Sequence, residues 1–180
     1  WDIVRVSARL GALYGDGGQN PGNHFWWQGK FYSRTGRTPD LPLFVESTGY
    51  GTGEGLCGWN CRHSFGPGDL RHNPYAQFDA EENKRAFDLS QKQRGKESRI
   101  RRTKTKLVGL RTAIEAAEDA GVKATLEAQY TRTAKLLEKQ NLDYNQFCED
   151  NGLKRLSDRI QIAKWTREDA RKSIAAARSK

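Results

Sequence analysis

The 180 residues are enough for one ordinary domain, or for a small domain with a helical extension, and a shift in composition near residue 75 favours the second. No segment reaches the roughly 20 apolar residues that cross a bilayer and no signal-like segment opens the chain, so we expect no membrane partner. The net charge is +9, and the whole surplus lies between Lys84 and Arg111, where basic residues outnumber acidic ones by eleven to two.

The chain contains no methionine, and residues 1–8 begin at once as an alternating, β-branched segment. We therefore expect the C-terminal part of a longer protein, with further sequence before Trp1. The three cysteines do not resemble the even set of a small secreted disulfide protein. Reduced thiols and synthesis in a cytoplasm are expected.

The first 75 residues are predicted to form a strand-and-loop module. They hold all five prolines, four of the five tryptophans and most of the glycines. We expect strands over residues 2–8, 26–33 and 43–46, with little helix. Aromatic side chains are expected to supply much of this core, because aliphatic residues are scarce here.

The rest of the chain has the pattern of helices. Asp79 and Glu82 resemble a capping box, and Gly95 is expected to kink or break the helix that follows. The helix is expected to stop at Ala120-Gly121. Two apolar stripes predict that this helix and the next close as an antiparallel hairpin. The stripes are Leu107, Leu110, Ile114 and Ala117, then Leu126, Tyr130, Ala134 and Leu137.

The hairpin is expected to end at Asn151-Gly152, and Thr166 is expected to cap a last helix, after a short apolar stripe over residues 153–163. The predicted fold class is α+β. A small strand-and-loop module (1–75) with a Cys/His cluster is followed by a long, basic helical hairpin (76–150) and short C-terminal helices (151–180).

A cluster of cysteine and histidine residues is the first candidate site. Cys57-Gly-Trp-Asn-Cys61-Arg-His63 follows a glycine-rich approach, and His24 lies upstream. We predict a structural zinc site made of these four residues, because zinc takes four nitrogen or sulfur ligands and would stabilise a small, loop-rich module. The Cys-x3-Cys-x-His spacing is not that of a standard zinc finger. The alternative is two small buried thiols and two histidines that hydrogen-bond across strands.

An enzyme is a second hypothesis for the same residues. Cys57 or Cys61 would be the nucleophile and His24 or His63 the base, oriented by a third group. We lean away from this interpretation, because His63 follows Cys61 by only two residues and catalytic sites are recognised by geometry.

The basic helix is the second candidate site. Its charges are suited to neutralising packaged DNA or to meeting an acidic protein surface, and such binding would weaken steeply with salt. No aromatic residue lies between Phe87 and Tyr130, so neither base stacking nor sequence-specific reading is expected. The alternative is a solvated helix face with i,i+4 ion pairs. The predicted polyanion-binding residues are Arg94, Arg101, Arg102, Lys104 and Lys106.

Three blocks of sequence, residues 4–12, 24–33 and 48–65, resemble the C-terminal half of the phage minor capsid protein 2 family. The blocks Trp27-Gln-Gly-Lys30 and Cys61-Arg-His63 are the most specific, and the likeness extends over most of residues 4–163. The resemblance implies a minor structural protein of a tailed phage or prophage virion, located in or near the head and portal. It further implies other capsid and portal proteins as partners, and assembly in the bacterial host cytoplasm.

A looser likeness connects the chain to another head-morphogenesis family of tailed phages. It places His24, Cys61 and His63 opposite metal-ligand positions of that family. Some relatives of that family are linked to an ADP-ribosyltransferase-like fold, and such an activity here would use His24, Tyr32, Ser33 and either Glu46 or Glu54. An effector domain of this kind, or a cysteine-dependent hydrolase, is the alternative function.

Overall fold

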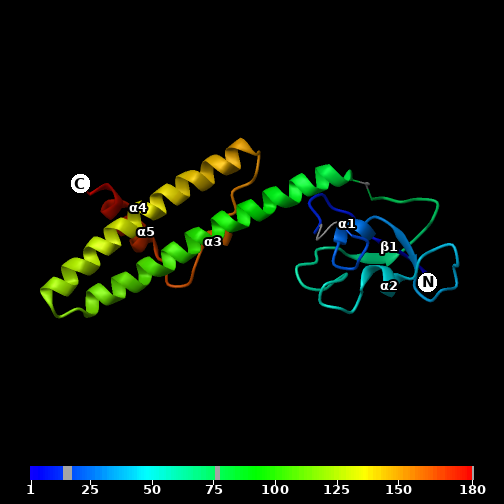
Figure 1. Cartoon of the computed structure of the whole chain (residues 1–180), viewed down its shortest axis with the longest axis horizontal. Coiled ribbons are helices and arrows are strands. Elements are labelled where there is room, and N and C mark those ends of the chain that lie inside the picture. The colour runs from blue at the N-terminus through cyan, green and yellow to red at the C-terminus, as the bar shows by residue number, and fades with distance from the viewer. Residues whose placement is uncertain (14–17, 76–77, 180) are drawn as a thin grey trace. The chain divides into compact units, whose positions relative to one another are not determined.

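The computed structural model describes residues 1–13, 18–75 and 78–179 (Figure 1). It confirms the α+β class, because a three-stranded antiparallel sheet is followed by two long helices and a shorter C-terminal one. The chain divides into two compact units, Trp1–Ser90 and Gln91–Lys180.

The sheet of the first unit has β1 (Ile3–Val6) as its central strand, between β2 (Phe31–Ser33) and β3 (Phe65–Pro67). Both neighbours are antiparallel to β1. Val4 and Val6 are fully buried while the residues between and before them are half-exposed, which is the two-residue period of a strand. The first predicted strand is confirmed. The sequence did not predict β3, because its glycine and proline are typical of loops.

Two short helices occupy places where strands were predicted. The predicted strand 26–33 is wrong over Trp26 and Trp27, which belong to α1 (His24–Trp27), and correct over Phe31–Ser33, which is β2. The predicted strand 43–46 is wrong over residues 44–46, which lie in α2 (Phe44–Thr48), whereas Leu43 forms a single parallel β-bridge with Ser33. A glycine fixes the end of α2. Gly49 ends the helix with a left-handed φ of 60°, and its backbone packs so closely that a Cβ would lie 2.5 Å from Pro21 Cβ.

Aromatic residues supply half of the core of the first unit, as expected. The buried set is Val4, Val6, Trp27, Tyr32, Phe44 and Leu56. The polar atoms of two of these rings are satisfied by backbone carbonyls: Tyr32 Oη donates to Trp27 O at 2.7 Å and Trp27 Nε1 donates to Pro21 O at 2.8 Å. The core therefore packs against α1, whose first residue, His24, is one of the predicted site residues.

The first long helix, α3 (Ala80–Ala116), begins in the first unit and continues into the second. Asp79 caps its start by accepting hydrogen bonds from the backbone N–H groups of Glu81 and Glu82, close to the predicted capping box. The helix runs uninterrupted through Gly95, so the predicted break is wrong. A glycine lowers helix propensity without ending a helix that is packed along its length.

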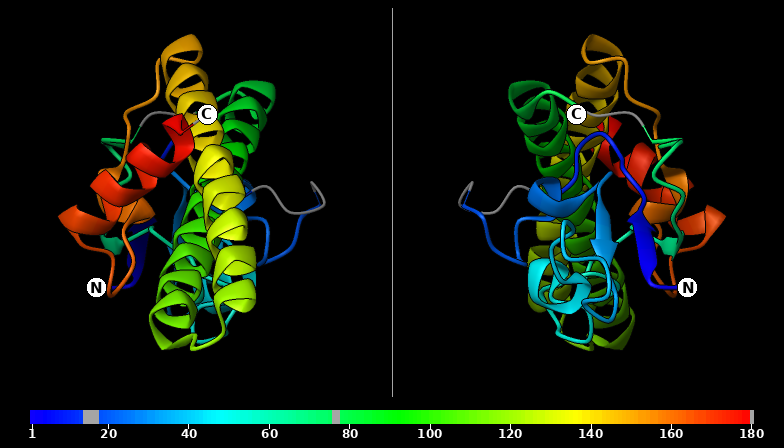
Figure 2. Two further views of the ribbon diagram at one scale, coloured as in Figure 1. Left: turned by 90° about the vertical axis from the view of Figure 1, so that its left-hand side faces the viewer. Right: turned by 90° about the vertical axis from the view of Figure 1, so that its right-hand side faces the viewer.

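In the second unit α4 (Ala120–Asp150) runs antiparallel to α3, as the two apolar stripes predicted (Figures 1 and 2). Asp119 caps α4 by accepting from Val122 N at 2.8 Å, so α3 stops four residues before the predicted end. The shared core contains residues of α3, α4 and the C-terminal helix. These are Ile100, Leu107, Ala134, Leu137, Tyr144, Cys148 and Ala177.

The C-terminal segment packs against this hairpin. α4 ends where predicted, with Gly152 at a φ of 60° just beyond it. The stripe over residues 153–163 forms only the 3-10 helix η1 (Ser157–Ile160), and α5 (Arg167–Arg178) begins with the predicted Thr166 cap. None of the helices among the described residues is both long and apolar enough to cross a membrane.

Candidate metal centre

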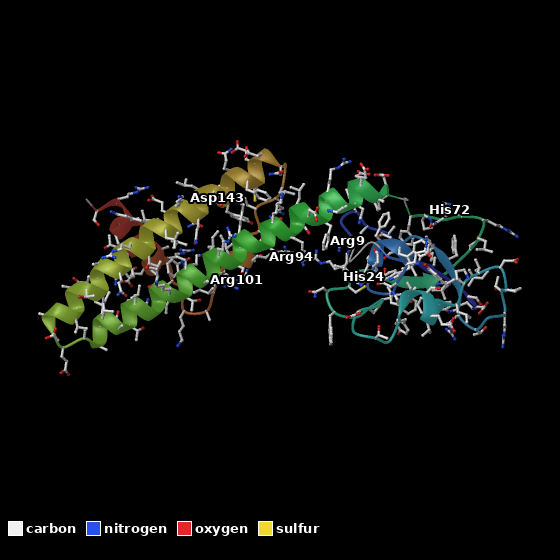
Figure 3. The ribbon with its side chains drawn as sticks, viewed as in Figure 1. Arg9, His24, His72, Arg94, Arg101 and Asp143 are labelled. Atoms are coloured by element: carbon white, nitrogen blue, oxygen red, sulfur yellow. The ribbon has the colours of Figure 1, made fainter. Side chains whose placement is uncertain are left out.

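The structure brings three of the four predicted zinc ligands together. One ring nitrogen of His24, one of His63 and the Sγ of Cys61 all lie within 4.8 Å of one another. His24 opens α1, whereas Cys61 and His63 lie in the loop that leads into β3. Both histidines are buried and Cys61 is partly exposed; His24 lies inside the sheet-containing unit (Figure 3). The cluster therefore joins α1 to the edge of the sheet.

Glycines shape the loop that carries Cys61 and His63. A Cβ on Gly55 would lie 2.2 Å from Gly49 O, and one on Gly58 would lie 2.4 Å from Gly53 O. These approaches are open only to glycine, because real Cβ atoms do not come this close to backbone. The glycine-rich approach seen in the sequence is thus a loop that folds tightly on itself.

A hydrogen bond that His63 donates to Gln28 fixes the tautomer of the His63 ring. The backbone N–H of Arg9 donates to Gln28 Oε1 at 2.9 Å, which identifies this side-chain atom as the oxygen. His63 Nε2 lies 2.9 Å from the same oxygen and must therefore carry the proton. His63 Nδ1 is left with a lone pair, and it lies 3.7 Å from Cys61 Sγ.

His24 has the same arrangement. Its Nε2 lies 2.8 Å from the backbone carbonyl oxygen of Glu54, so Nε2 donates and Nδ1 keeps its lone pair. Histidines that bind metals commonly donate one ring N–H to a carbonyl or carboxylate and use the other nitrogen as the ligand. Both histidines of the cluster are held in this form.

Burial keeps both imidazoles neutral. It lowers the pKa of His24 despite the hydrogen bond to Glu54. Burial, together with the repulsion that a protonated His24 and the charge of Arg9 would exert, lowers the pKa of His63 to about 3. The neutral ring is the form that binds metal ions, so the cluster is ready to bind at neutral pH.

Trp27 and Gln28 form the inner wall of the cluster. The ring of Trp27 is fully buried, with its centroid 4.8 Å from that of His24 and 4.9 Å from that of His63. Gln28 Nε2 is buried and has no hydrogen-bond partner among the described residues. A buried donor without a partner costs about 1–3 kcal/mol of stability. The hydrogen bonds that Gln28 Oε1 accepts therefore determine the orientation of this side chain.

Sequence reasoning missed the two groups that orient the histidines. Gln28 lies in the Trp27-Gln-Gly-Lys30 block, and the close likeness of this block to the phage minor capsid protein 2 family could have marked Gln28 as a site residue. The carbonyl of Glu54 left no signal, because every residue has one.

Cys57, the fourth predicted ligand, lies apart from the other three. Cys57 is exposed, and its thiol donates a weak hydrogen bond to the backbone carbonyl of His63 at 3.9 Å. Burial of the sulfur and the negative charge of a Cys61 thiolate raise the pKa of Cys57. Cys57 is therefore a less acidic thiol than a free cysteine, and it lies outside the group of three ligand atoms.

The residues of the ADP-ribosyltransferase hypothesis are engaged in structural contacts or exposed. Tyr32 is buried and bonded to Trp27, and Ser33 donates from Oγ to Asp2 Oδ2 at 2.8 Å. Glu46 and Glu54 are exposed, and the contact of Glu54 with His24 is through its backbone.

The five predicted polyanion-binding residues do not share one face of α3. Arg101 donates to Arg159 O at 2.5 Å, and Lys104, which is buried, donates to Ile160 O at 2.8 Å. These two cations cap carbonyls around η1. Arg94 is half-buried, whereas Arg102 and Lys106 are exposed. Arg94 and Arg101 are labelled on α3 in Figure 3.

Two further basic residues, Lys92 and Arg99, are exposed and were not singled out by the sequence. Together with Arg102 and Lys106 they recur at intervals of seven, three and four residues, which places all four on one helix face. Helical spacing was the signal that would have selected them. We call this set, Lys92, Arg99, Arg102 and Lys106, the basic stripe.

Comparison with known proteins identifies the family. A sequence model of the family described as Phage minor capsid protein 2 matches residues 2–141, well over half of the chain. The chain belongs to this family of phage minor capsid proteins, as the resemblance indicated, and thus to the components of the virion. No curated protein and no solved structure matches it.

Proposed function

We propose that the protein is a minor structural component of the head of a tailed phage or prophage, located at or near the portal and assembled in the bacterial cytoplasm. The observation that carries the proposal is the family match over residues 2–141. That match includes both the Cys/His cluster and the whole of α3. On this proposal, the partners of the protein are other capsid and portal proteins.

Fractionation of purified virions tests this location. Virions of the phage that encodes the chain are separated into DNA-filled heads and tails, and each fraction is analysed by quantitative mass spectrometry. The proposal predicts that the protein follows the portal protein into the head fraction at a constant ratio. Recovery with tails alone, or only in the lysate outside the virion, would contradict it.

Within this function, the basic stripe of α3 would bind DNA without sequence specificity. Four exposed cations on one face can neutralise a row of phosphates, and none of them makes an ion pair in the described structure. We leave Arg101 and Lys104 out of the basic stripe because each donates to a backbone carbonyl around η1.

The salt dependence of duplex binding tests the stripe. Removing one cation that binds a phosphate lowers the slope of log affinity against log salt by about 1, so the triple variant R99Q/R102Q/K106Q is expected to lower it by about 3. The matched control removes three exposed cations of α4, as K123Q/R132Q/K135Q, and should keep the slope. Equal slopes in both variants would show that the stripe does not bind DNA. If the protein binds purified portal protein but not DNA, the stripe would instead contact an acidic protein surface.

A cysteine-dependent hydrolase is the second candidate function. Cys61 Sγ lies 3.7 Å from His63 Nδ1, and Gln28 orients the other side of that ring, which is the order of a nucleophile, a base and an orienting group. The low pKa of His63 works against it, because a neutral imidazole stabilises a thiolate poorly. Alkylation rates distinguish the two functions: a hydrolase requires Cys61 to react with iodoacetamide much faster than Cys57 near pH 6.

A further inference from the structure

We propose that the cluster is a zinc centre in which His24 Nδ1, Cys61 Sγ and His63 Nδ1 are the protein ligands and water takes the fourth position. Cys57 is left outside the coordination sphere. The inference goes beyond the proposed function and does not depend on it, because a zinc centre is compatible with any role of the virion protein.

The distances between the ligand atoms fit a tetrahedral ion. Zinc bonds of about 2.3 Å to sulfur and about 2.0 Å to nitrogen place a sulfur and a nitrogen ligand about 3.5 Å apart. Cys61 Sγ and His63 Nδ1 lie 3.7 Å apart, and the set of three lies within 4.8 Å. Side-chain rotations that move the ligand atoms by about 1 Å are therefore enough to close the site around an ion.

The groups behind the ligands are in place as well. Gln28 Oε1 accepts from His63 Nε2 at 2.9 Å, and Glu54 O accepts from His24 Nε2 at 2.8 Å. These two contacts select the tautomer with a free Nδ1 in each ring, which is the state that binding requires. The unpartnered Nε2 of Gln28 shows that the glutamine is held in this orientation at a cost.

The donor set selects the kind of metal. One thiolate and two neutral imidazoles suit zinc, whereas calcium and magnesium require oxygen ligands. Among the described residues the buried apolar cluster of the first unit is small, so an ion that joins α1 to the loop before β3 adds a crosslink to that core. The exposure of Cys57 and its contact with the His63 carbonyl place that thiol on the outer side of the loop.

The two cysteines of one loop provide a matched pair for the test. Protein purified without added metal or chelator is analysed for metal content as wild type, C61S and C57S. The proposal predicts about one zinc per chain in the wild type and in C57S, and a large loss in C61S. Equal loss in C57S and C61S would overturn the three-ligand assignment, and a wild type that takes up no zinc when dialysed against it would overturn the site.

Cobalt substitution and a second variant cover the case in which C61S does not fold. Cobalt-loaded wild type and C57S should show the same sulfur-to-metal charge-transfer band, since both contain one metal–thiolate bond. Q28M leaves all three ligands in place but removes the acceptor for His63, and it is expected to lower zinc affinity by about 10- to 100-fold with an unchanged circular dichroism spectrum. Unchanged affinity in Q28M, or a weaker cobalt band in C57S, would contradict the proposal.

Discussion

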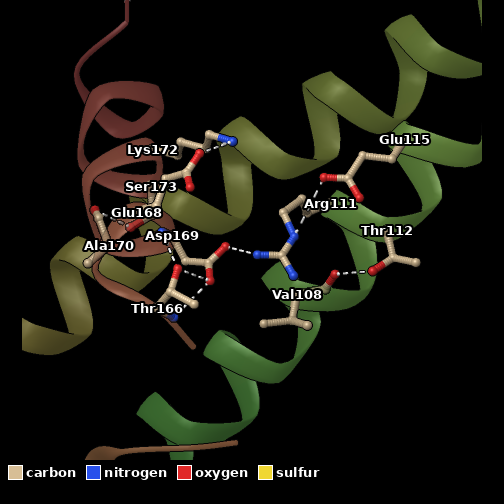
Figure 4. Close-up of polar contacts among 10 residues, drawn as sticks. All are labelled: Val108, Arg111, Thr112, Glu115, Thr166, Glu168, Asp169, Ala170, Lys172 and Ser173. Carbon is tan, nitrogen blue, oxygen red and sulfur yellow. Dashed lines mark hydrogen bonds and ion pairs between the residues drawn. The ribbon is translucent and has the colours of Figure 1, made fainter. Parts of the chain in front are cut away.

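Asp169 makes several polar contacts within the second unit (Figure 4). Its side chain is only 4% exposed and accepts a hydrogen bond from Arg111 of α3. It also accepts from the backbone N–H and the hydroxyl of Thr166, both at 2.8 Å, while its own N–H donates to the Thr166 hydroxyl at 3.1 Å. One carboxylate thus completes the capping box of α5 and attaches this helix to α3.

Replacing Asp169 should destabilise the second unit strongly. D169A leaves the cap open and Arg111 without its buried partner, so we expect a loss of about 3 kcal/mol in the free energy of unfolding measured in urea. The control is E168A, the adjacent residue, whose ion pair with Lys172 is exposed on both sides and should therefore contribute little to stability. Equal losses in the two variants would show that burial of Asp169 has no energetic role.

The same carboxylate predicts a dependence of stability on pH. Burial raises the pKa of Asp169, but the hydrogen bonds from Thr166 and Arg111 outweigh it and lower the pKa below its ordinary value. A lowered pKa in the folded state contributes stability above the unfolded value of about 3.9, and this contribution disappears as the pH falls through the folded value. Urea midpoints recorded from about pH 6 to about pH 2 should therefore fall less steeply in D169N than in the wild type. Parallel curves would contradict this assignment.

Among the elements, α3 contains a glycine whose replacement should stabilise the protein. Gly95 is exposed in mid-helix, and a Cβ there meets no atom within 4 Å in the described structure. G95A is therefore expected to raise the free energy of unfolding by about 0.5–1 kcal/mol. A lower melting temperature in G95A would show that the helix needs flexibility at this point.

The loop before β3 should respond in the opposite sense. A Cβ on Gly55 would lie 2.2 Å from the carbonyl oxygen of Gly49, which no rotation of a side chain can relieve. G55A should therefore displace the loop that carries Cys61 and lower the melting temperature of the first unit, measured by tryptophan fluorescence. Because Gly51 has open space around it but a φ of 94°, G51A controls for backbone strain without a clash. A smaller effect in G55A than in G51A would contradict the packing argument.

The elements also show what could be predicted from the sequence. α4 and α5 were found with nearly correct ends, because their apolar periods and their Asn151-Gly152 and Thr166 signals are local. α1 and α2 were missed, since four or five residues carry too little of a helical period to be distinguished from a strand.

Residue types were enough to select His24, Cys61 and His63 as candidate ligands, and the structure brings these three together, but their arrangement could not be predicted from the sequence. Gln28 contacts His63 from 35 positions away in the chain, and the Arg111–Asp169 pair spans 58 positions. Contacts of this kind depend on how the elements pack, which no local pattern specifies. The same holds for Lys104, whose charge suggested a polyanion and whose burial directs it to the Ile160 carbonyl.

At the scale of the whole molecule, each of the two units has a core of its own. The Cys/His cluster borders the core of the first unit, where Cys61 packs against it, whereas the second unit is held by its hairpin, its buried polar contacts and α5. A metal ion at the cluster should therefore stabilise one unit and leave the other unchanged.

Hydrogen exchange followed by mass spectrometry, with and without a strong chelator, tests this account most directly. We predict that removal of the metal abolishes protection in peptides from residues 20–67, whereas peptides of α4 exchange as before. Unchanged exchange in residues 20–67, or an equal loss of protection in both units, would contradict the claim that His24, Cys61 and His63 hold an ion that stabilises the first unit.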